Sequence, residues 1–253
     1  MRTKNKILYS GIILFILAIL AIVFVDKSLF WRTQRNEIEE WAQHAAVVQS
    51  KNRPIVLFIG DSRIANFPLR LAFPQNFMII NKGIGGNSIK QISERYRSII
   101  DKTPHDIVVV NGGINDILGC VINNKNEKII VSNILYQYEK IISMSINNNK
   151  DVMIIEMIPV TNRFLFPFMR AVSLPTRFDV KKTNRIVVKV NDQLKKLCLK
   201  TGSSFIETHN VLAHSNGEFI RDFSAADGYH LNITGYKVLS SVIEPYLIQM
   251  KMK

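Results

Sequence analysis

The chain has 253 residues, 47% of them hydrophobic, which is enough for one large domain or two small ones with a buried core. Its 33 Lys and Arg outnumber 20 Asp and Glu, giving a formal net charge of +13, which favours anionic partners or simply a well-solvated surface. The chain has no run of five like charges and no basic strip interleaved with aromatic residues, so it is not expected to bind nucleic acid.

The N-terminus has the pattern of a membrane anchor. Arg2, Lys4 and Lys6 precede residues 7–25, an uncharged run of 19 residues. As a helix this run would be about 28 Å long, close to the ~30 Å hydrocarbon core of a bilayer. It ends without the small-residue cleavage site of a signal peptide and has no polar face. The pattern therefore favours an uncleaved anchor over a cleaved signal or a buried core helix.

The segments flanking this run predict the domain boundaries. Basic residues occur on both sides of it, and the positive-inside rule leans slightly toward a cytoplasmic N-terminus with the rest of the chain outside. We therefore expect a single-pass membrane protein with its folded domain in an extracytoplasmic location. The predicted parts are a tip and transmembrane anchor at 1–26, a stem helix or linker at 27–53, and one folded domain at 54–253.

Beyond the stem, short apolar runs alternate with segments of helical periodicity. The apolar runs predict buried strands at 55–59, 77–80, 107–110, 152–155 and 204–206. Helical spacing of apolar residues predicts helices over 88–100, 128–146, 181–200 and 233–250. This alternation predicts an α/β fold with a mostly parallel sheet and helices on both faces. In such sheets ligands bind at the carboxyl ends of the strands.

Polar and glycine-rich blocks follow the first three predicted strands, and another precedes the last predicted helix. Gly60-Asp61-Ser62 follows the first strand, a glycine-rich stretch over 81–87 the second, and a stretch over 111–116 containing Asn115 the third. Asp227-Gly228-Tyr229-His230 comes just before the last helix. We expect all four blocks to lie at one edge of the sheet.

The residue types in these blocks suit acyl transfer. A serine hydroxyl such as that of Ser62 needs an adjacent base to become a nucleophile. His230 can accept its proton, and Asp227, three residues earlier, can orient the imidazole. An oxyanion needs hydrogen-bond donors, which the Ser62 and Gly86 amides and the Asn115 side chain can supply. Each block alone is a weak signal, so the inference depends on their order and placement.

Together the four blocks resemble those of the SGNH hydrolases, also called the GDSL family. The resemblance covers roughly residues 54–248, and its third block is Gly113-Ile114-Asn115-Asp116. It implies a flavodoxin-like three-layer α/β/α sandwich with a mostly parallel five-stranded sheet, here preceded by one N-terminal transmembrane helix. It also implies an esterase that needs neither a metal nor a cofactor.

Carried over position by position, the resemblance implies specific roles. Ser62, Asp227 and His230 correspond to the catalytic residues, and Ser62, Gly86 and Asn115 to the oxyanion hole. In the glycine-rich stretch, Gly86 is favoured over Gly83 and Gly85 because family members with this pattern use the last glycine.

Three features depart from the family pattern or lie outside its motifs. Arg63 follows the serine where many members have a small or apolar residue, and we expect that it could place a cation near an acidic substrate. The segment 157–180, rich in Phe and Pro, could line an acyl pocket, touch the bilayer or simply pack over the sheet edge. Cys120 and Cys198 could form one bridge, although two buried free thiols are favoured.

The predicted function is hydrolysis of an O-acyl ester, with acetyl as the first expectation, through an acyl-Ser62 intermediate on a cell-envelope glycan or lipid. Transfer of the acyl group to a glycan hydroxyl would use the same residues, so an O-acyltransferase is the alternative. A non-catalytic, membrane-tethered binding module is disfavoured because the serine, histidine and asparagine are all present. A nucleotide-binding protein is disfavoured because the glycine-rich turn lacks a P-loop lysine and a dinucleotide fingerprint.

Overall fold

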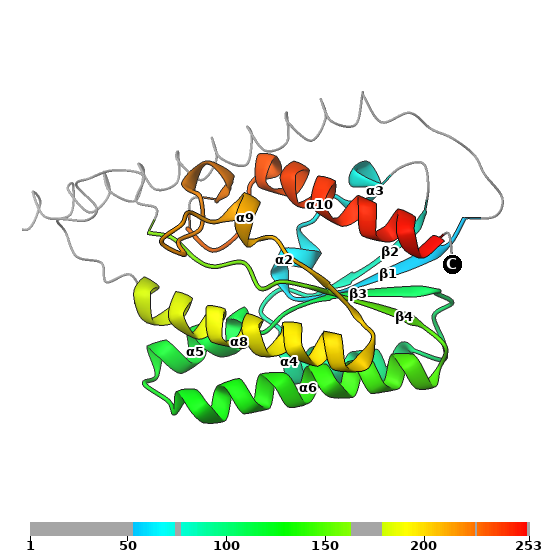
Figure 1. The fold of residues 1–253 in the computed structure, drawn as a ribbon, viewed down its shortest axis with the longest axis horizontal. Helices are drawn as coiled ribbons and strands as arrows, with labels where there is room; N and C mark the ends of the chain where they lie inside the picture. The colour runs from blue at the N-terminus through cyan, green and yellow to red at the C-terminus, as the bar shows by residue number, and fades with distance from the viewer. Residues whose placement is uncertain (1–52, 74–76, 163–178, 226, 252–253) are drawn as a thin grey trace, which may run out of the picture. The chain divides into compact units, whose positions relative to one another are not determined.

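The computed structural model describes residues 53–73, 77–162, 179–225 and 227–251 (Figure 1). Within these ranges, no helix has both the length and the apolar character required to cross a membrane. The predicted anchor at 7–25 and the predicted stem up to residue 52 lie outside the described residues, so their assignment stays a prediction.

Five strands form one sheet in the order β2-β1-β3-β4-β5, and each neighbouring pair is parallel. The strands are β1 (Ile55–Gly60), β2 (Met78–Gly83), β3 (Ile107–Asn111), β4 (Asp151–Ile155) and β5 (Ser204–Ile206). The predicted five-stranded parallel sheet is therefore confirmed. The central strands β1 and β3 are buried on both faces, which is why their sequences are continuous apolar runs.

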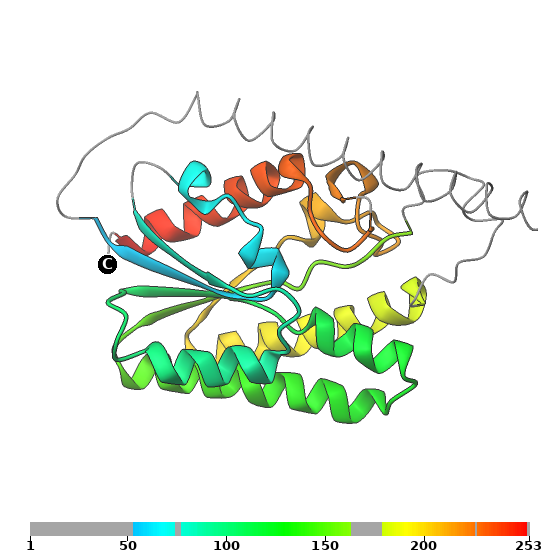
Figure 2. The same ribbon diagram turned by 180° about the vertical axis from the view of Figure 1, so that it is seen from behind.

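Helices cover both faces of the sheet, so the three-layer α/β sandwich is confirmed (Figures 1 and 2). One face carries α4 (Ile89–Ile99), α5 (Ile114–Ile122), α6 (Glu127–Asn147) and α8 (Val180–Thr201). The other carries α2 (Ser62–Ala65), α3 (Leu69–Ala72), α9 (His209–Leu212) and α10 (Ile233–Lys251). A 3₁₀ turn, η1 (Arg221–Phe223), lies between α9 and α10 in the chain.

Successive residues of β1 serve two separate cores. Leu57 packs with buried apolar residues of α4, α5, α6 and α8. Phe58 points to the opposite face, where its ring stacks on Phe73 with centroids 5.8 Å apart and meets Phe67 edge-on. Phe67 in turn stacks on Tyr236 of α10 at 4.8 Å. These contacts fix α10, and the loop that precedes it, against the segment that follows β1.

Side-chain caps explain why the long helices begin where the periodicity predicts. Ser88 and Gln91 form a reciprocal capping box at the start of α4. Asn126 caps α6 and Asp179 caps α8 through side-chain oxygens that accept backbone N–H groups of the first turn. Gly202, with φ of 73°, ends α8 in the left-handed conformation that glycine adopts without steric cost.

The structure differs from the predicted elements at two blocks. Strand β2 extends to Gly83, so residues 81–83 pair with β1 instead of following the strand. Helix α5 was not predicted, since the glycines of the third block obscure the helical pattern that begins at Ile114. Of the segment 157–180, residues 157–161 are buried and 163–178 lie outside the described residues, so its predicted contacts with an acyl chain or a bilayer stay untested.

The topology brings the predicted blocks together. The chain leaves β1 for β2 on one side and then crosses to β3 on the other, so β1 is flanked by β2 and β3. Gly60, at the end of β1, pairs with Gly83 on β2 and Asn111 on β3. The chain segments that follow these strands therefore emerge side by side, at the point where α/β sheets of this kind form their ligand sites.

Candidate active site

The turn after β1 presents Ser62 at the start of α2. Gly60 permits this turn because a Cβ there would lie 2.2 Å from the Asn111 carbonyl oxygen and 2.4 Å from Ile64 Cγ1. Asp61 caps α2 by accepting the Arg63 backbone N–H at its Oδ1, 2.9 Å away. As the first residue of the helix, Ser62 has a backbone N–H without an intrahelical acceptor. The turn therefore offers a hydroxyl and an amide donor at the same place.

A hydrogen-bonded chain joins Ser62 to His230 and Asp227. The Ser62 Oγ lies 2.7 Å from His230 Nε2, and His230 Nδ1 lies 2.7 Å from Asp227 Oδ2. The Asp227 Oδ1 accepts the backbone N–H groups of Tyr229 and His230 at 3.1 and 3.0 Å. The structure thus brings together three residues that the sequence singled out, across a separation of 168 positions.

The charge of Asp227 determines the tautomer of His230. Burial by itself would raise the pKa of Asp227, but hydrogen bonds from the His230 side chain and from the backbone outweigh it and hold the pKa below its usual range. An ionised carboxylate can only accept, so His230 Nδ1 must carry the proton. In the neutral imidazole Nε2 is then the acceptor, and Ser62 Oγ–H donates to it. This arrangement suits removal of the hydroxyl proton.

The three glycines of the second block have different surroundings. A Cβ at Gly83 would lie 2.1 Å from the Ala65 backbone nitrogen, and the Gly83 N–H is already donated to Asn81 Oδ1 at 2.8 Å. Gly85 has space for a Cβ, which would meet Ser62 Cβ at 3.8 Å. Gly86 has a φ of 77° and its amide has no hydrogen-bond partner within the described part of the chain. Gly83 therefore serves close packing, and the Gly86 amide remains available as a donor.

The start of α5 holds the glycine-rich loop in place. The Asn115 side chain donates one amide hydrogen to the Asn87 carbonyl at 3.0 Å, which leaves its second hydrogen available. Asp116 accepts the Ile89 backbone N–H at 2.9 Å, at the start of α4. Burial raises the pKa of Asp116, and the bond from Ile89 opposes that shift. Asn115 and Asp116 together fix the segment that contains Gly86.

Arg95 on α4 also supports the glycine-rich loop. The Arg95 guanidinium on α4 donates to the Lys82 carbonyl at 2.7 Å, to the Gly60 carbonyl at 3.0 Å and to Asn87 Oδ1 at 2.9 Å. It thereby connects the loop to the end of β1. Neither the role of Arg95 nor the contact of Asp116 is apparent from the sequence. Their partners lie 8 to 35 positions away, which is beyond any local motif.

The position of Arg63 contradicts the expectation from the sequence. We expected that its charge could face an acidic substrate, but the side chain is only 2% exposed. Its guanidinium donates to the backbone carbonyls of Ile158, Pro159 and Tyr229. The side chain therefore points into the protein, away from any substrate at Ser62, and each of its three nitrogen atoms donates to a backbone carbonyl there.

The carboxyl group of Asp61, the residue before Ser62, is fully buried. Its Oδ2 has no hydrogen-bond partner among the residues that the structure describes. Burial raises the pKa of Asp61, against the opposing effects of the Arg63 guanidinium and the Arg63 backbone N–H. Asp61 and Arg63 are thus two buried groups whose charges act on each other.

Another carboxylate of the same region, three further histidines and both cysteines are not part of this arrangement. Asp222 is exposed, and the carboxylate that bonds His230 is that of Asp227. His105 is buried against Tyr96, while His209 and His214 lie in the segment after β5. Cys120 and Cys198 are buried free thiols. No group of three His, Cys, Asp or Glu suited to a metal ion occurs among the described residues.

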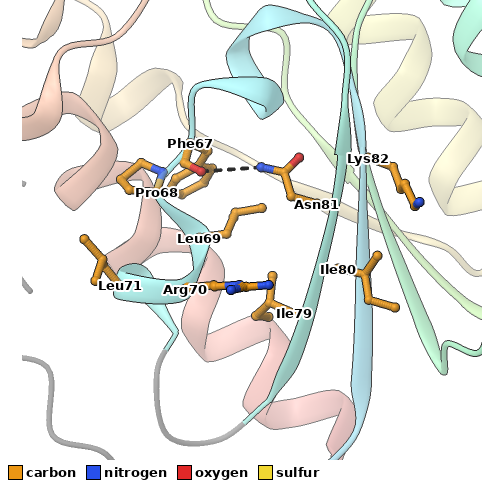
Figure 3. A pocket seen from close by; sticks show the side chains of 9 residues that line it. All are labelled: Phe67, Pro68, Leu69, Arg70, Leu71, Ile79, Ile80, Asn81 and Lys82. Atoms are coloured by element: carbon orange, nitrogen blue, oxygen red, sulfur yellow. Dashed lines mark hydrogen bonds between the residues drawn. The ribbon is translucent and has the colours of Figure 1, made fainter.

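A surface cavity of about 450 Å³ lies between α3 and the edge strand β2 (Figure 3). It is lined by residues 67–71 and 79–82, and Asn81 closes one end by donating to the Phe67 carbonyl. Neither Ser62 nor His230 lines it. The cavity is therefore separate from the hydrogen-bonded chain of Ser62, His230 and Asp227.

Comparisons with known proteins show the family of this chain. The model of the GDSL-like lipase/acylhydrolase family matches residues 58–238, which include all four blocks. A comparison with curated proteins gave no match.

Several solved structures share the fold. One is a putative platelet activating factor from Streptococcus pneumonia, with a TM-score of 0.61 and 22% identity over 89% of this chain and 97% of that one. A GDSL-like lipase from Bacteroides thetaiotaomicron has a TM-score of 0.61 and 18% identity over 86% and 98%. A catalytic mutant of an acetylxylan esterase from Geobacillus stearothermophilus has a TM-score of 0.54 and 16% identity over 80% and 96%. At these identities the likeness shows a common fold.

Proposed function

This chain belongs to the GDSL-like lipase/acylhydrolase family, and from that premise we propose that it hydrolyses an O-acyl ester through an acyl-enzyme formed on Ser62. The observation that carries the proposal is the chain of two 2.7 Å contacts from Ser62 Oγ through the His230 imidazole to Asp227. A hydroxyl paired with a base, and a base oriented by a carboxylate, form the arrangement that nucleophilic acyl transfer requires.

Acylation would begin with attack of Ser62 Oγ on the ester carbonyl carbon while His230 Nε2 takes the hydroxyl proton. Asp227 stabilises the imidazolium that forms and remains ionised. Collapse of the tetrahedral intermediate breaks the bond to the alcohol, which leaves with the proton from His230. Water then attacks the acyl-Ser62 carbonyl with His230 again as the base, releasing the carboxylic acid and restoring the serine.

Three donors beside Ser62 are suited to the oxyanion of both tetrahedral intermediates. They are the backbone amides of Ser62 and Gly86 and the second side-chain hydrogen of Asn115. Support comes from two observations: neither amide has a hydrogen-bond partner among the residues that the structure describes, and the bonds of Asn115 and Asp116 fix the loop in advance. Donors held in position before the reaction stabilise developing charge without reorganisation.

The test is turnover of p-nitrophenyl acetate by the full chain in a mild detergent. We expect a burst of p-nitrophenol followed by steady release of acetate, and mass spectrometry of quenched protein should find acetyl on Ser62. Absence of both turnover and acetyl-Ser62 in folded protein would reject the proposal. Accumulation of acetyl-Ser62 without acetate release, relieved by a sugar alcohol, would identify an acyltransferase instead.

Replacement of Asn115 with alanine should lower kcat about 10²- to 10³-fold with a small change in KM. The loss is expected because a donor to the oxyanion acts mainly in the transition state. Asn123→Ala is the matched control, since Asn123 lies at the other end of α5 and its side chain donates to the Gly119 carbonyl within the same helix. A loss confined to KM, or equal losses in both variants, would remove Asn115 from the oxyanion hole.

For the substrate, we propose an acetylated glycan or lipid of the cell envelope. The net charge of +13 and the anchor pattern at 7–25 support an acidic or membrane-associated substrate, and one protein of the same fold is an acetylxylan esterase. Activity on p-nitrophenyl esters of increasing chain length tests the acyl group. Activity confined to long chains would contradict the acetyl assignment.

We further propose single-pass anchoring through residues 7–25, with the folded domain on the extracytoplasmic side. In cell fractionation the full chain should sediment with membranes, and a chain lacking residues 1–26 should not. External protease should degrade the domain in intact cells. A full chain that stays in the soluble fraction would contradict the anchor, and a protected domain would contradict the orientation.

A further inference from the structure

Arg63 is buried more completely than arginine side chains usually are. It is 2% exposed, and arginine is almost never buried at this level unless its charge and donors are satisfied. All three nitrogen atoms of its guanidinium donate to backbone carbonyls: Nε to Tyr229 at 3.0 Å, Nη1 to Ile158 at 2.6 Å and Nη2 to Pro159 at 3.3 Å. The fork geometry of a guanidinium allows one side chain to bind three such acceptors.

The acceptors belong to two segments that meet at the site. Tyr229 lies between Asp227 and His230 and packs on the His230 ring, with centroids 4.3 Å apart. Ile158 and Pro159 follow β4, and this segment bonds the same loop through the Thr161 N–H and the Gly228 carbonyl at 2.8 Å. The guanidinium therefore holds the loop of His230 directly, through the Tyr229 carbonyl, and indirectly, through the segment that follows β4.

The backbone of Arg63 is fixed on both sides. Its N–H donates to Asp61 Oδ1, and its carbonyl accepts the hydroxyl hydrogen of the buried Tyr236 on α10 at 2.9 Å. Since Ser62 is the preceding residue, these bonds fix the nucleophile as well. One residue thus joins the Ser62 turn to the His230 loop, which is 166 positions away in the chain.

We propose that Arg63 is a positioning residue that sets the contact between Ser62 Oγ and His230 Nε2. This inference rests on the proposed function of the site. Arg63 does not touch substrate, because its donors face inward. It acts by keeping two separate loops in register, and a displacement of about 1 Å between reacting groups can cost about 10²-fold in rate.

The experiment compares Arg63→Met in the parent chain and in the His230→Ala chain, with p-nitrophenyl acetate as substrate. If Arg63 acts by positioning His230, kcat should fall about 10²-fold in the parent with KM little changed, and less than about 3-fold once His230 is absent. A general weakening of the structure would lower kcat by the same factor in both backgrounds. Arg185→Met, which removes an exposed arginine paired with Glu127, is the control and should leave kcat unchanged.

Each outcome decides the proposal. Equal losses in the two backgrounds, or full activity of folded Arg63→Met, would overturn it while the activity of the parent leaves the esterase assignment intact. If the Met variant does not fold, Arg63→Lys replaces it, because lysine keeps the charge but cannot bind three carbonyls. The lysine variant should fold and show the same dependence on His230. Failure of both variants to fold would make Arg63 a core residue and refute the positioning role.

Discussion

Replacing Ser62 with alanine is expected to lower kcat for p-nitrophenyl acetate about 10⁴- to 10⁶-fold, the loss that follows when an acyl-transfer nucleophile is removed. Without the hydroxyl no covalent intermediate can form, and only the oxyanion donors remain to assist direct attack by water. The initial burst of p-nitrophenol should disappear together with the steady-state rate.

The stability of Ser62→Ala should remain close to that of the parent. Within the described ranges the Ser62 side chain bonds only His230, and the turn itself is fixed by Gly60, by Asp61 and by the bonds of Arg63. Ser241→Ala is the control, since Ser241 is an exposed serine that bonds within α10. A Ser62→Ala chain that keeps more than about a tenth of the parent rate would exclude a serine acyl-enzyme.

Replacing Asp227 with asparagine is expected to lower kcat about 10⁴-fold although the shape of the side chain is retained. The ionised carboxylate accepts from His230 Nδ1 and so keeps Nε2 free to accept the proton of Ser62. An asparagine amide can donate to Nδ1, which favours the opposite tautomer and places a hydrogen on Nε2. The histidine would then no longer act as a base toward Ser62.

Asp222→Asn tests whether this effect belongs to one carboxylate. Asp222 is exposed on η1, five positions before Asp227, and its backbone carbonyl accepts the Asn232 side chain. The substitution should leave kcat within about 2-fold of the parent, because surface changes away from the site have small effects. Similar losses in both variants would indicate a general effect of negative charge instead of a specific tautomer.

The glycines of the motifs show what a sequence pattern can and cannot specify. Gly60, Gly83 and Gly86 occur in blocks that together indicate the family, but the structure requires glycine at these positions for two different physical reasons. Gly60 and Gly83 leave no room for a Cβ between neighbouring backbones, whereas Gly86 has open space and a positive φ. Spacing along the chain does not distinguish these cases, because close packing depends on segments that are distant in sequence.

Local patterns by themselves determined the architecture and the candidate residues. Continuous apolar runs marked all five strands. The central strands β1 and β3 are buried on both faces, whereas the edge strand β2, predicted as buried, is partly exposed. Helical periodicity marked the four long helices. Four short blocks were enough to identify Ser62, Asp227, His230, Gly86 and Asn115. The family match over residues 58–238 shows the family, while the roles of these residues are proposals and the anchor at 7–25 remains a prediction from composition.

The tertiary structure alone decided how these residues are held. The contact between Ser62 and His230, the support of the glycine-rich loop by Arg95, and the inward direction of Arg63 all join segments that are far apart in the chain. A polar side chain carries the same local signal whether it faces substrate or buried carbonyls. Its partners become defined only when the sheet brings the loops together. For this reason the sequence suggested a substrate contact for Arg63, whereas the structure shows contacts with buried backbone carbonyls.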